Sequence, residues 1–319
     1  MKSLRKRVTF SLIMGAALGM AAAAHAKPVT VVTIDDKAVF PESITSTKAG
    51  DLIIGSTSKG AVYRAKAGSA KATLWLDPAK TGMRTVLGVF ADDASNTLYV
   101  CSIAPPAAAG AARQLELAAV RTFDLKTGAA KGNYPMTDPS TAFCNDIAVG
   151  KDGAAYVSDT PNAQVLKLAK GASALTVWIK DERIASIDGL AVGDGALYVN
   201  AVRTNKLFSI AMNADGSAGA ITELTPSLPL ANPDGMRGLG GNKFLQAENS
   251  GTAGRITEVT VTGDKANIRV LKAAPGATAI TKVGNVVWVN DAKFAYRPPN
   301  GPLKDQSPEP FVETAIPFK

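Results

Sequence analysis

The chain has 319 residues, with 35 lysines and arginines against 27 aspartates and glutamates, one histidine and two cysteines. A formal charge of +8 without a cluster of basic residues does not indicate a nucleic-acid or membrane partner. Because the single histidine, His25, lies in the N-terminal segment described next, the rest of the chain cannot form a Ser-His or Cys-His pair or an imidazole-based zinc, copper or iron site.

Residues 1–26 have the three-part layout of a secretory signal. A basic start is followed by an apolar stretch from about residue 8 to residue 24 and by the small-x-small sequence Ala24-His25-Ala26. The alternative is a membrane anchor, but the apolar stretch is short and no stop-transfer pattern follows it. We therefore expect a periplasmic or secreted chain of residues 27–319 that has no membrane span and a net charge of about +4, since four basic residues leave with the signal.

A recurring pattern of short apolar strands and Gly/Asp/Asn turns fills the rest of the chain. Six copies begin near residues 42, 87, 145, 188, 234 and 277, at spacings of about 43 to 58 residues. Asp152-Gly153 and Asp194-Gly195 lie between apolar runs, which is the short-range signal of a β-hairpin. Each such unit has one apolar sheet face that only stacking against another unit buries.

The pattern predicts an all-β, six-bladed β-propeller with four-stranded antiparallel blades, formed as a single domain by residues 27–319. A β-sandwich is the alternative, and six similar units in series argue against it. Strand patterns also occupy residues 29–34 and 311–318. We expect one of these two strands, the N-terminal one for preference, to complete the last blade and close the ring, and residues 297–310 to be irregular.

Two features should lie at one end of the propeller. Residues 104–118 lengthen the connection after the second strand of the second unit, as a lid or as a surface elaboration. Cys101 and Cys144 are placed at the same end in neighbouring blades, which favours a disulfide over two buried free thiols in an exported chain.

Several polar residues stand where apolar strands begin, namely Glu42, Asn145, Asp146, Asp188 and Asp234. The first strand of each blade lines the central channel, so these side chains should converge at one end of it. Converging carboxylates repel one another and lose solvation, and a bound cation neutralises them. Carboxylate and amide oxygens are the ligands that calcium prefers, so Ca²⁺, or another divalent cation with oxygen ligands, is the expected cofactor. The alternative is ordinary turn chemistry, because Asp and Asn before Gly are common turn residues.

Four short motifs resemble those of the gluconolactonase and regucalcin (senescence marker protein) family of six-bladed propellers. They are Phe40-Pro41-Glu42, the stretch from Phe143 through Cys144-Asn145-Asp146 to Val149, Ser186-Ile187-Asp188-Gly189-Leu190 and Pro233-Asp234-Gly235-Met236.

The resemblance implies that Glu42, Asp188 and Asp234 bind a divalent metal and that Asn145 lies beside the metal and the substrate. The chain departs from the family at two positions. Asp188 replaces an asparagine and adds a negative charge, while Phe143 replaces an arginine that binds the sugar lactone. A sugar lactone would lose a charged donor here, so Phe143 suggests a more apolar ligand.

The resulting hypothesis is a calcium-dependent lactone or ester hydrolase that acts in the cell envelope. Asp234 would orient or deprotonate the attacking water, while Asn145 and Phe143 would contact the substrate. The alternative is a non-catalytic propeller that binds a small ligand or an envelope protein, since this fold hosts many functions. Isomerase and oxidoreductase activities complete the range, although the chain has no phosphate loop or dinucleotide motif. We expect a monomer.

Overall fold

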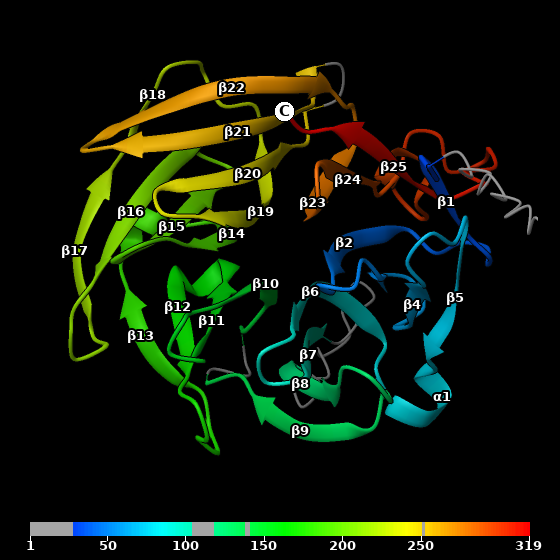
Figure 1. Cartoon of the computed structure of the whole chain (residues 1–319), viewed down its shortest axis with the longest axis horizontal. Helices are drawn as coiled ribbons and strands as arrows, with labels where there is room; N and C mark the ends of the chain where they lie inside the picture. Colours follow the sequence, from blue (N-terminus) through cyan, green and yellow to red (C-terminus); the bar gives the residue numbers. More distant parts are fainter. Residues whose placement is uncertain (1–27, 104–117, 138–140, 251–252) are drawn as a thin grey trace, which may run out of the picture.

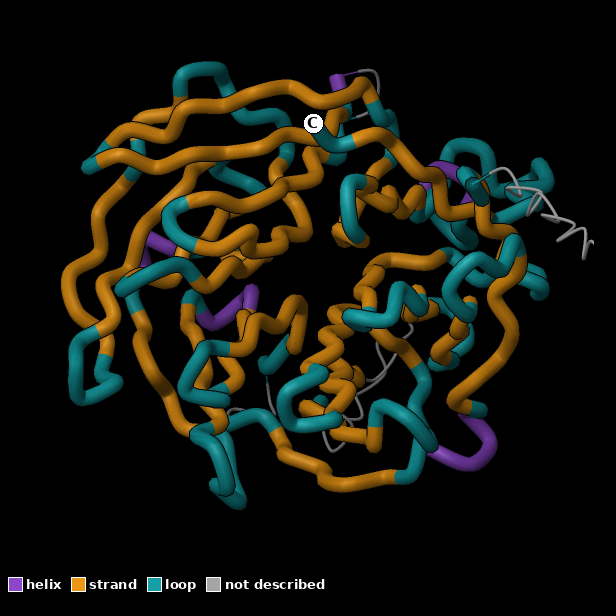
Figure 2. The backbone as a smooth tube through the Cα atoms, in the orientation of Figure 1, coloured by secondary structure: helices purple, strands orange, loops and turns teal. Residues whose placement is uncertain are grey.

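The computed structural model describes residues 28–103, 118–137, 141–250 and 253–319. The predicted signal, residues 1–26, and the predicted insert, residues 104–118 apart from Ala118, lie outside the described residues. β-Sheets surround a central axis in Figure 1, and the tube in Figure 2 follows the same ring. The all-β propeller architecture is confirmed, and the alternative of a two-sheet sandwich was wrong.

The main series of strands in each sheet is antiparallel and starts with its innermost strand, and short strands add two parallel pairs. Three sheets have four strands and follow chain order: β6 (Thr85–Asp92), β7 (Thr97–Ile103), β8 (Ala119–Asp124) and β9 (Ala130–Pro135); β10 (Cys144–Val149), β11 (Ala155–Asp159), β12 (Gln164–Leu168) and β13 (Thr176–Lys180); β14 (Ile187–Val192), β15 (Ala196–Ala201), β16 (Lys206–Met212) and β17 (Ala218–Glu223). A fourth sheet adds a short outer strand to four others: β19 (Pro233–Gly240), β20 (Lys243–Glu248), β21 (Arg255–Thr262), β22 (Lys265–Ala273) and β18 (Thr225–Pro226).

The remaining sheet has eight strands because the two ends of the chain meet in it. Its order is β2 (Pro41–Ser46), β3 (Leu52–Ser56), β4 (Val62–Ala65), β5 (Lys71–Leu76), β1 (Val31–Ile34), β25 (Val312–Pro317), β24 (Val286–Asp291) and β23 (Ala277–Val283). Strand β1 pairs antiparallel with β25 and parallel with β5, with Val32 opposite Glu313 and Thr33 opposite Lys71. The N-terminal strand therefore joins the C-terminal sheet, as predicted.

Among the residues that the structure describes, helical elements are single turns. They include α1 (Pro78–Thr81) and the 3₁₀ turns η2 (Thr160–Asn162), η3 (Glu182–Ile184) and η5 (Phe294–Tyr296). Between η5 and Phe311 the described chain forms no strand, so this segment is irregular, as expected. Within the described residues, no helix is long and apolar enough to cross a membrane.

The innermost strands contact one another in a closed cycle, in the order β2, β6, β10, β14, β19, β23 and back to β2. Apolar side chains from neighbouring sheets pack between them; Ile53 of β3, Val86 of β6 and Leu98 of β7, for example, belong to one buried cluster. Stacking buries the apolar sheet faces that no single sheet covers. The cycle brings the starts of the inner strands to one end of the channel.

A disulfide joins two neighbouring sheets at this end. Cys101 of β7 and Cys144 of β10 are bonded, with their Cα atoms 5.2 Å apart and a sequence separation of 43. Both cysteines are fully buried. The predicted pairing is therefore present, and it fixes the start of β10 against the adjacent sheet.

Candidate functional site

Every inner strand has a break in its pairing register close to its start. The breaks fall between these residues: Pro41 and Ile44, Val86 and Val89, Cys144 and Ile147, Ile187 and Leu190, Pro233 and Met236, and Ala277 and Ala279. Glu42, Asn145, Asp188 and Asp234 each occupy the first position inside such a break. A β-bulge re-aims the side chain that it carries. The polar strand starts noted in the sequence are therefore bulge positions.

The glycine after Asp188 is explained by close packing between strands. A Cβ atom on Gly189 would lie 2.4 Å from the carbonyl oxygen of Asp234, on the neighbouring inner strand. By contrast, Gly153 and Gly195, in the hairpin turns, adopt φ angles of +78° and +73°. Turn chemistry therefore accounts for the hairpin glycines, while Gly189 is required because the inner strands approach each other closely.

Buried polar residues at the ends of second strands hold the bulges in place. Asn200 accepts a hydrogen bond from Gly189 N–H at 2.9 Å and donates one to the Asp234 carbonyl at 2.7 Å. The Ser158 hydroxyl accepts a hydrogen bond from Asp146 N–H at 2.9 Å. These contacts satisfy the backbone groups that a bulge removes from the ladder, so the site rests on a rigid frame.

The four predicted site residues meet at this end of the channel. Glu42, Asn145 and Asp188 are buried, while Asp234 is partly accessible. Asn145 donates from Nδ2 to Asp188 Oδ2 at 2.8 Å and to Thr160 Oγ1 at 3.0 Å. Both amide hydrogens of Asn145 are thus used, and its Oδ1 atom accepts no hydrogen bond from the described residues. That oxygen is left for a ligand or a cation.

Burial and neighbouring acids disfavour the charged forms of all three carboxyl groups. Burial raises the pKa of Glu42 well above its ordinary value, and the charge of Asp188 raises it further. Burial and the charge of Asp146 raise the pKa of Asp188 to about 7, although the Asn145 hydrogen bond opposes this rise. Burial raises the pKa of Asp234 well above its ordinary value, with the charges of Asp188 and Glu42 adding to it. Negative charge at this end of the channel therefore lacks compensation.

The donor set fits a divalent cation chemically. Glu42 Oε2 is buried and has no hydrogen-bond partner among the described residues. A cation would satisfy that oxygen and remove the mutual repulsion of the acids. The side chains are not drawn into a preformed cage, however, because no three Asp, Glu, His or Cys side chains in the described part of the chain lie at metal-binding spacing.

Asp146, which sequence reasoning grouped with the other strand starts, has a different environment. Arg237 of β19 donates to its two carboxylate oxygens at 3.1 and 3.2 Å. The same guanidinium donates to the carbonyls of Ile44 and Val89 and of its neighbour Met236. Asp146 and Arg237 are thus a buried pair that ties four inner strands together across the channel. An arginine inside an otherwise apolar strand is the sequence signal for this pair, and Arg237 was not among the predicted residues.

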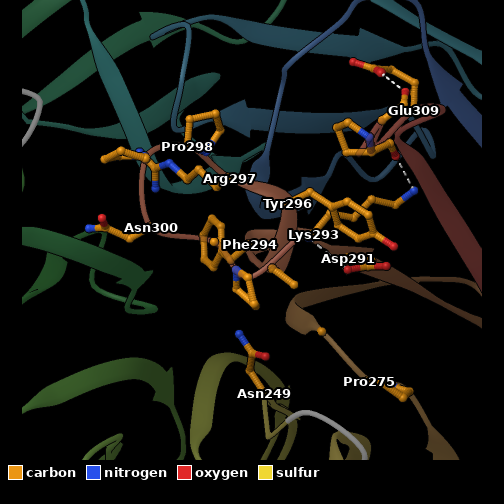
Figure 3. A pocket seen from close by; sticks show the side chains of 17 residues that line it. Asn249, Pro275, Asp291, Lys293, Phe294, Tyr296, Arg297, Pro298, Asn300 and Glu309 are labelled. Carbon is orange, nitrogen blue, oxygen red and sulfur yellow. Dashed lines mark hydrogen bonds between the residues drawn. The ribbon is translucent and has the colours of Figure 1, made fainter. Parts of the chain in front are cut away.

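Two cavities lie at this end of the molecule. The larger, of about 1530 Å³, is lined by the segment from Lys293 to Glu309 and by Asn249 (Figure 3). Asn249 also hydrogen-bonds to Asp234, which connects this cavity to the acids. Arg297 lines the same cavity, and its charge opposes the rise in the pKa of Glu42. Arg297 was missed because it stands in a segment without any periodic pattern.

The smaller cavity, of about 760 Å³, contains Phe143. Its wall also includes Thr160, which accepts a hydrogen bond from Asn145, and Pro161, Ala185 and Ser186. Phe143 itself is partly buried, and its N–H donates to Asp159 Oδ1 at 2.9 Å. The structure thus places Phe143 on a mostly apolar wall beside Asn145, away from the larger cavity.

Comparison with known proteins identifies the fold. No protein-family model matches the chain, and no curated protein matches its sequence. Among solved structures, a gluconolactonase from Xanthomonas campestris superposes with a TM-score of 0.64 at 16% identity, over 91% of this chain and 89% of that one. The calcium-binding protein regucalcin from Agrobacterium tumefaciens gives 0.60 at 12%, over 89% and 93%. Virginiamycin B lyase from Staphylococcus aureus gives 0.57 at 13%, over 91% and 98%. The chain has the gluconolactonase- and regucalcin-like propeller fold.

Proposed function

We propose that residues 27–319 form one six-bladed propeller that is exported to the periplasm or the medium and hydrolyses lactones or related esters with the help of a divalent cation, calcium for preference. Six inner strands in a closed cycle support the blade count. The Cys101–Cys144 disulfide and the signal-like N-terminus support export. The observation that carries the proposal is the gathering of three acids, Glu42, Asp188 and Asp234, whose pKa values are all raised by burial and by neighbouring negative charge, with Asn145 hydrogen-bonded to Asp188.

Glu42, Asp188, Asp234 and Asn145 would hold the cation with their side-chain oxygens. A bound divalent cation supplies polarisation of the substrate carbonyl and stabilisation of the oxyanion. The hydrogen bonds between Asn200 and the backbone of Gly189 and Asp234 fix the strand positions from which two of these side chains leave. Asn145 is fixed by Asp188 and Thr160, so its Oδ1 atom has a set direction.

Asp234 is the proposed general base. It is the most accessible of the three acids, so its carboxylate is the one that a water molecule can reach most readily. Asn249 and Gly235 N–H both hydrogen-bond to its carboxylate and orient it. Asp234 would take the proton of an attacking water. Opening a lactone ring then needs little help for the leaving alkoxide.

The apolar wall around Phe143 would select the substrate. Thr160, which accepts a hydrogen bond from Asn145, is part of this wall. A ligand held at the acids can therefore extend an alkyl group onto Phe143 and Pro161. Lactones with aliphatic substituents are therefore preferred to highly hydroxylated sugar lactones. A lyase reaction like that of virginiamycin B lyase is less consistent, because a histidine-to-alanine variant of that enzyme is catalytically inactive and this chain has no histidine after His25.

Acid release from a panel of aliphatic and sugar lactones, followed with added calcium and with chelator, tests the proposal. We expect calcium-dependent hydrolysis that Asp234→Asn reduces by about 10²-fold or more, since general acid–base catalysis contributes roughly that much. Asp194→Asn is the matched control, because Asp194 forms only an exposed pair with Lys151 in a hairpin turn. If the wild type releases acid no faster than Asp234→Asn does, the chain is a non-catalytic binding propeller.

A further inference from the structure

The larger cavity is walled on one side by the irregular segment that follows η5. After η5 the chain turns back on itself, since Arg297 N–H donates to the Phe294 carbonyl at 3.0 Å and the Arg297 carbonyl accepts from Gly301 N–H at 2.8 Å. Figure 3 shows Phe294, Tyr296, Arg297 and Asn300 on this wall, with Asn249 across the cavity. The backbone bonds on both sides of Arg297 fix the point from which its side chain leaves.

Two basic residues, Lys293 and Arg297, lie on this wall. Of the two, only the Lys293 side chain has hydrogen-bond partners within the described part of the chain. Lys293 Nζ donates to the carbonyls of Pro308 and Pro310 at 2.7 and 2.8 Å, so its charge holds the segment together. Arg297 is half-buried, yet its guanidinium has no hydrogen bond and no ion pair with any described residue. The guanidinium lies over the Phe294 ring, whose centre is 5.5 Å away.

A half-buried guanidinium that remains unpaired is costly. The group keeps its charge at all physiological pH values, and it has lost part of its hydration. Burial lowers the pKa of Arg297, and the nearby charge of Glu42 opposes this shift only in part. The five donors of the guanidinium are therefore available to a ligand in the cavity.

We propose that Arg297 is the residue that anchors the carboxylate of a small organic monoacid in the larger cavity. Arginine matches a carboxylate with two parallel hydrogen bonds, and stacking on Phe294 restrains the plane of its donors. The amides of Asn249 and Asn300 line the same cavity and suit hydroxyl or carbonyl groups on the ligand. Because Glu42 is close by, a monoanion meets less repulsion than a dianion such as phosphate.

This inference rests on the proposed function only for the position of the ligand site, and it identifies a second specificity-determining residue there. The hydroxy acid that forms when a lactone opens is one ligand of the required chemistry. Its carboxylate would lie at Arg297 and its remaining part near the acids. A binding propeller that performs no hydrolysis would recognise the same class of acid.

Calorimetric titration of the calcium-loaded protein with hexanoate, gluconate, neutral hexanamide and inorganic phosphate tests the proposal. We expect at least one of the two carboxylates to bind tenfold or more tightly than hexanamide and phosphate. Arg297→Gln should lose that preference, and Arg297→Lys should recover part of it, because lysine keeps the charge but not the paired donors. Arg183→Gln is the control, since Arg183 is paired with Asp181 on the surface and lines neither of the two cavities.

Three results would overturn the proposal. The first is absence of carboxylate binding to the wild type, and the second is an equal loss of binding in Arg183→Gln. The third is a lowered melting temperature of unliganded Arg297→Gln with unchanged carboxylate affinity, which would make the arginine structural. Carboxylate binding without lactone hydrolysis would leave the inference standing and remove the hydrolase. Lactone hydrolysis without carboxylate binding would do the reverse.

Discussion

Asp146 and Asp188 begin neighbouring inner strands, but the protein uses them in opposite ways. Asp146 occupies the second position of its bulge and is paired with Arg237, which also bonds to the backbones of β2 and β6. Asp188 occupies the first position of its bulge and accepts only the Asn145 amide, while burial and Asp146 raise its pKa to about 7. The two positions of a bulge therefore differ in role. Asp146, at the second position, is a structural carboxylate whose charge is balanced, while Asp188, at the first position, is available to bind a ligand.

Replacement of Arg237 should have the largest effect. Arg237→Met leaves Asp146 as an unpaired buried charge and removes the bonds between inner strands, so the free energy of unfolding should fall by about 3–5 kcal/mol in denaturant melts. The double variant Asp146→Asn with Arg237→Met should recover much of this loss, because no uncompensated charge then remains. A change of less than about 1 kcal/mol in Arg237→Met would remove the structural half of the comparison.

Replacement of Asp188 should shift stability the other way. Without divalent cations at pH 8, the free energy of unfolding of Asp188→Asn should exceed that of the wild type by about 1 kcal/mol or more. One unit of pKa shift corresponds to about 1.4 kcal/mol. Asp146→Asn under the same conditions should lose stability, because it leaves Arg237 unpaired. Equal effects of the two substitutions would show that the two carboxylates are not different in kind.

Glu313 of β25 is a further buried acid, and it does not belong to an inner strand. Both of its carboxylate oxygens are buried without a partner among the described residues, and burial raises its pKa well above the ordinary value. An acid with a raised pKa stabilises the fold most below its unfolded pKa of about 4.5, and the stability falls as pH rises toward the folded pKa. Over that range each pH unit costs up to about 1.4 kcal/mol.

Glu313→Gln should therefore flatten the decline of stability with rising pH, as measured by melts between pH 4 and pH 8. Calcium should be present in both samples, so that the acids of the site contribute less to the slope. Glu258→Gln is a suitable control, because Glu258 is paired with Arg269 on the surface. An unchanged pH slope in Glu313→Gln would contradict the view of Glu313 as a buried neutral acid.

The sequence allowed the ring and the convergence of polar strand starts to be predicted because both repeat. A period of about 45 residues indicated the blades, and a polar residue before an apolar strand marked the inner-strand starts at Glu42, Asn145, Asp188 and Asp234. The closing strand could also be predicted, because residues 29–34 are an isolated strand pattern before the first repeat.

Contacts that occur once could not be predicted. Arg237 reaches Asp146 across 91 residues and bonds to backbone carbonyls, which have no sequence signature. Arg297 stands in an irregular segment, where neither period 2 nor the repeat period indicates which way a side chain points. Gly189 resembled a turn glycine, and only the neighbouring strand's Asp234 carbonyl gives its physical reason.

Glu42, Asp188, Asp234 and Asn145 are proposed to hold one divalent cation together. Thermal melts of the protein with calcium and with chelator would show whether they do. At about 100 times the dissociation constant, calcium should add roughly 2.7 kcal/mol to the stability of the wild type. Glu42→Gln should lose most of that gain and Asp194→Asn should keep it. An absence of any calcium shift in the wild type, or a full shift in Glu42→Gln, would contradict the claim.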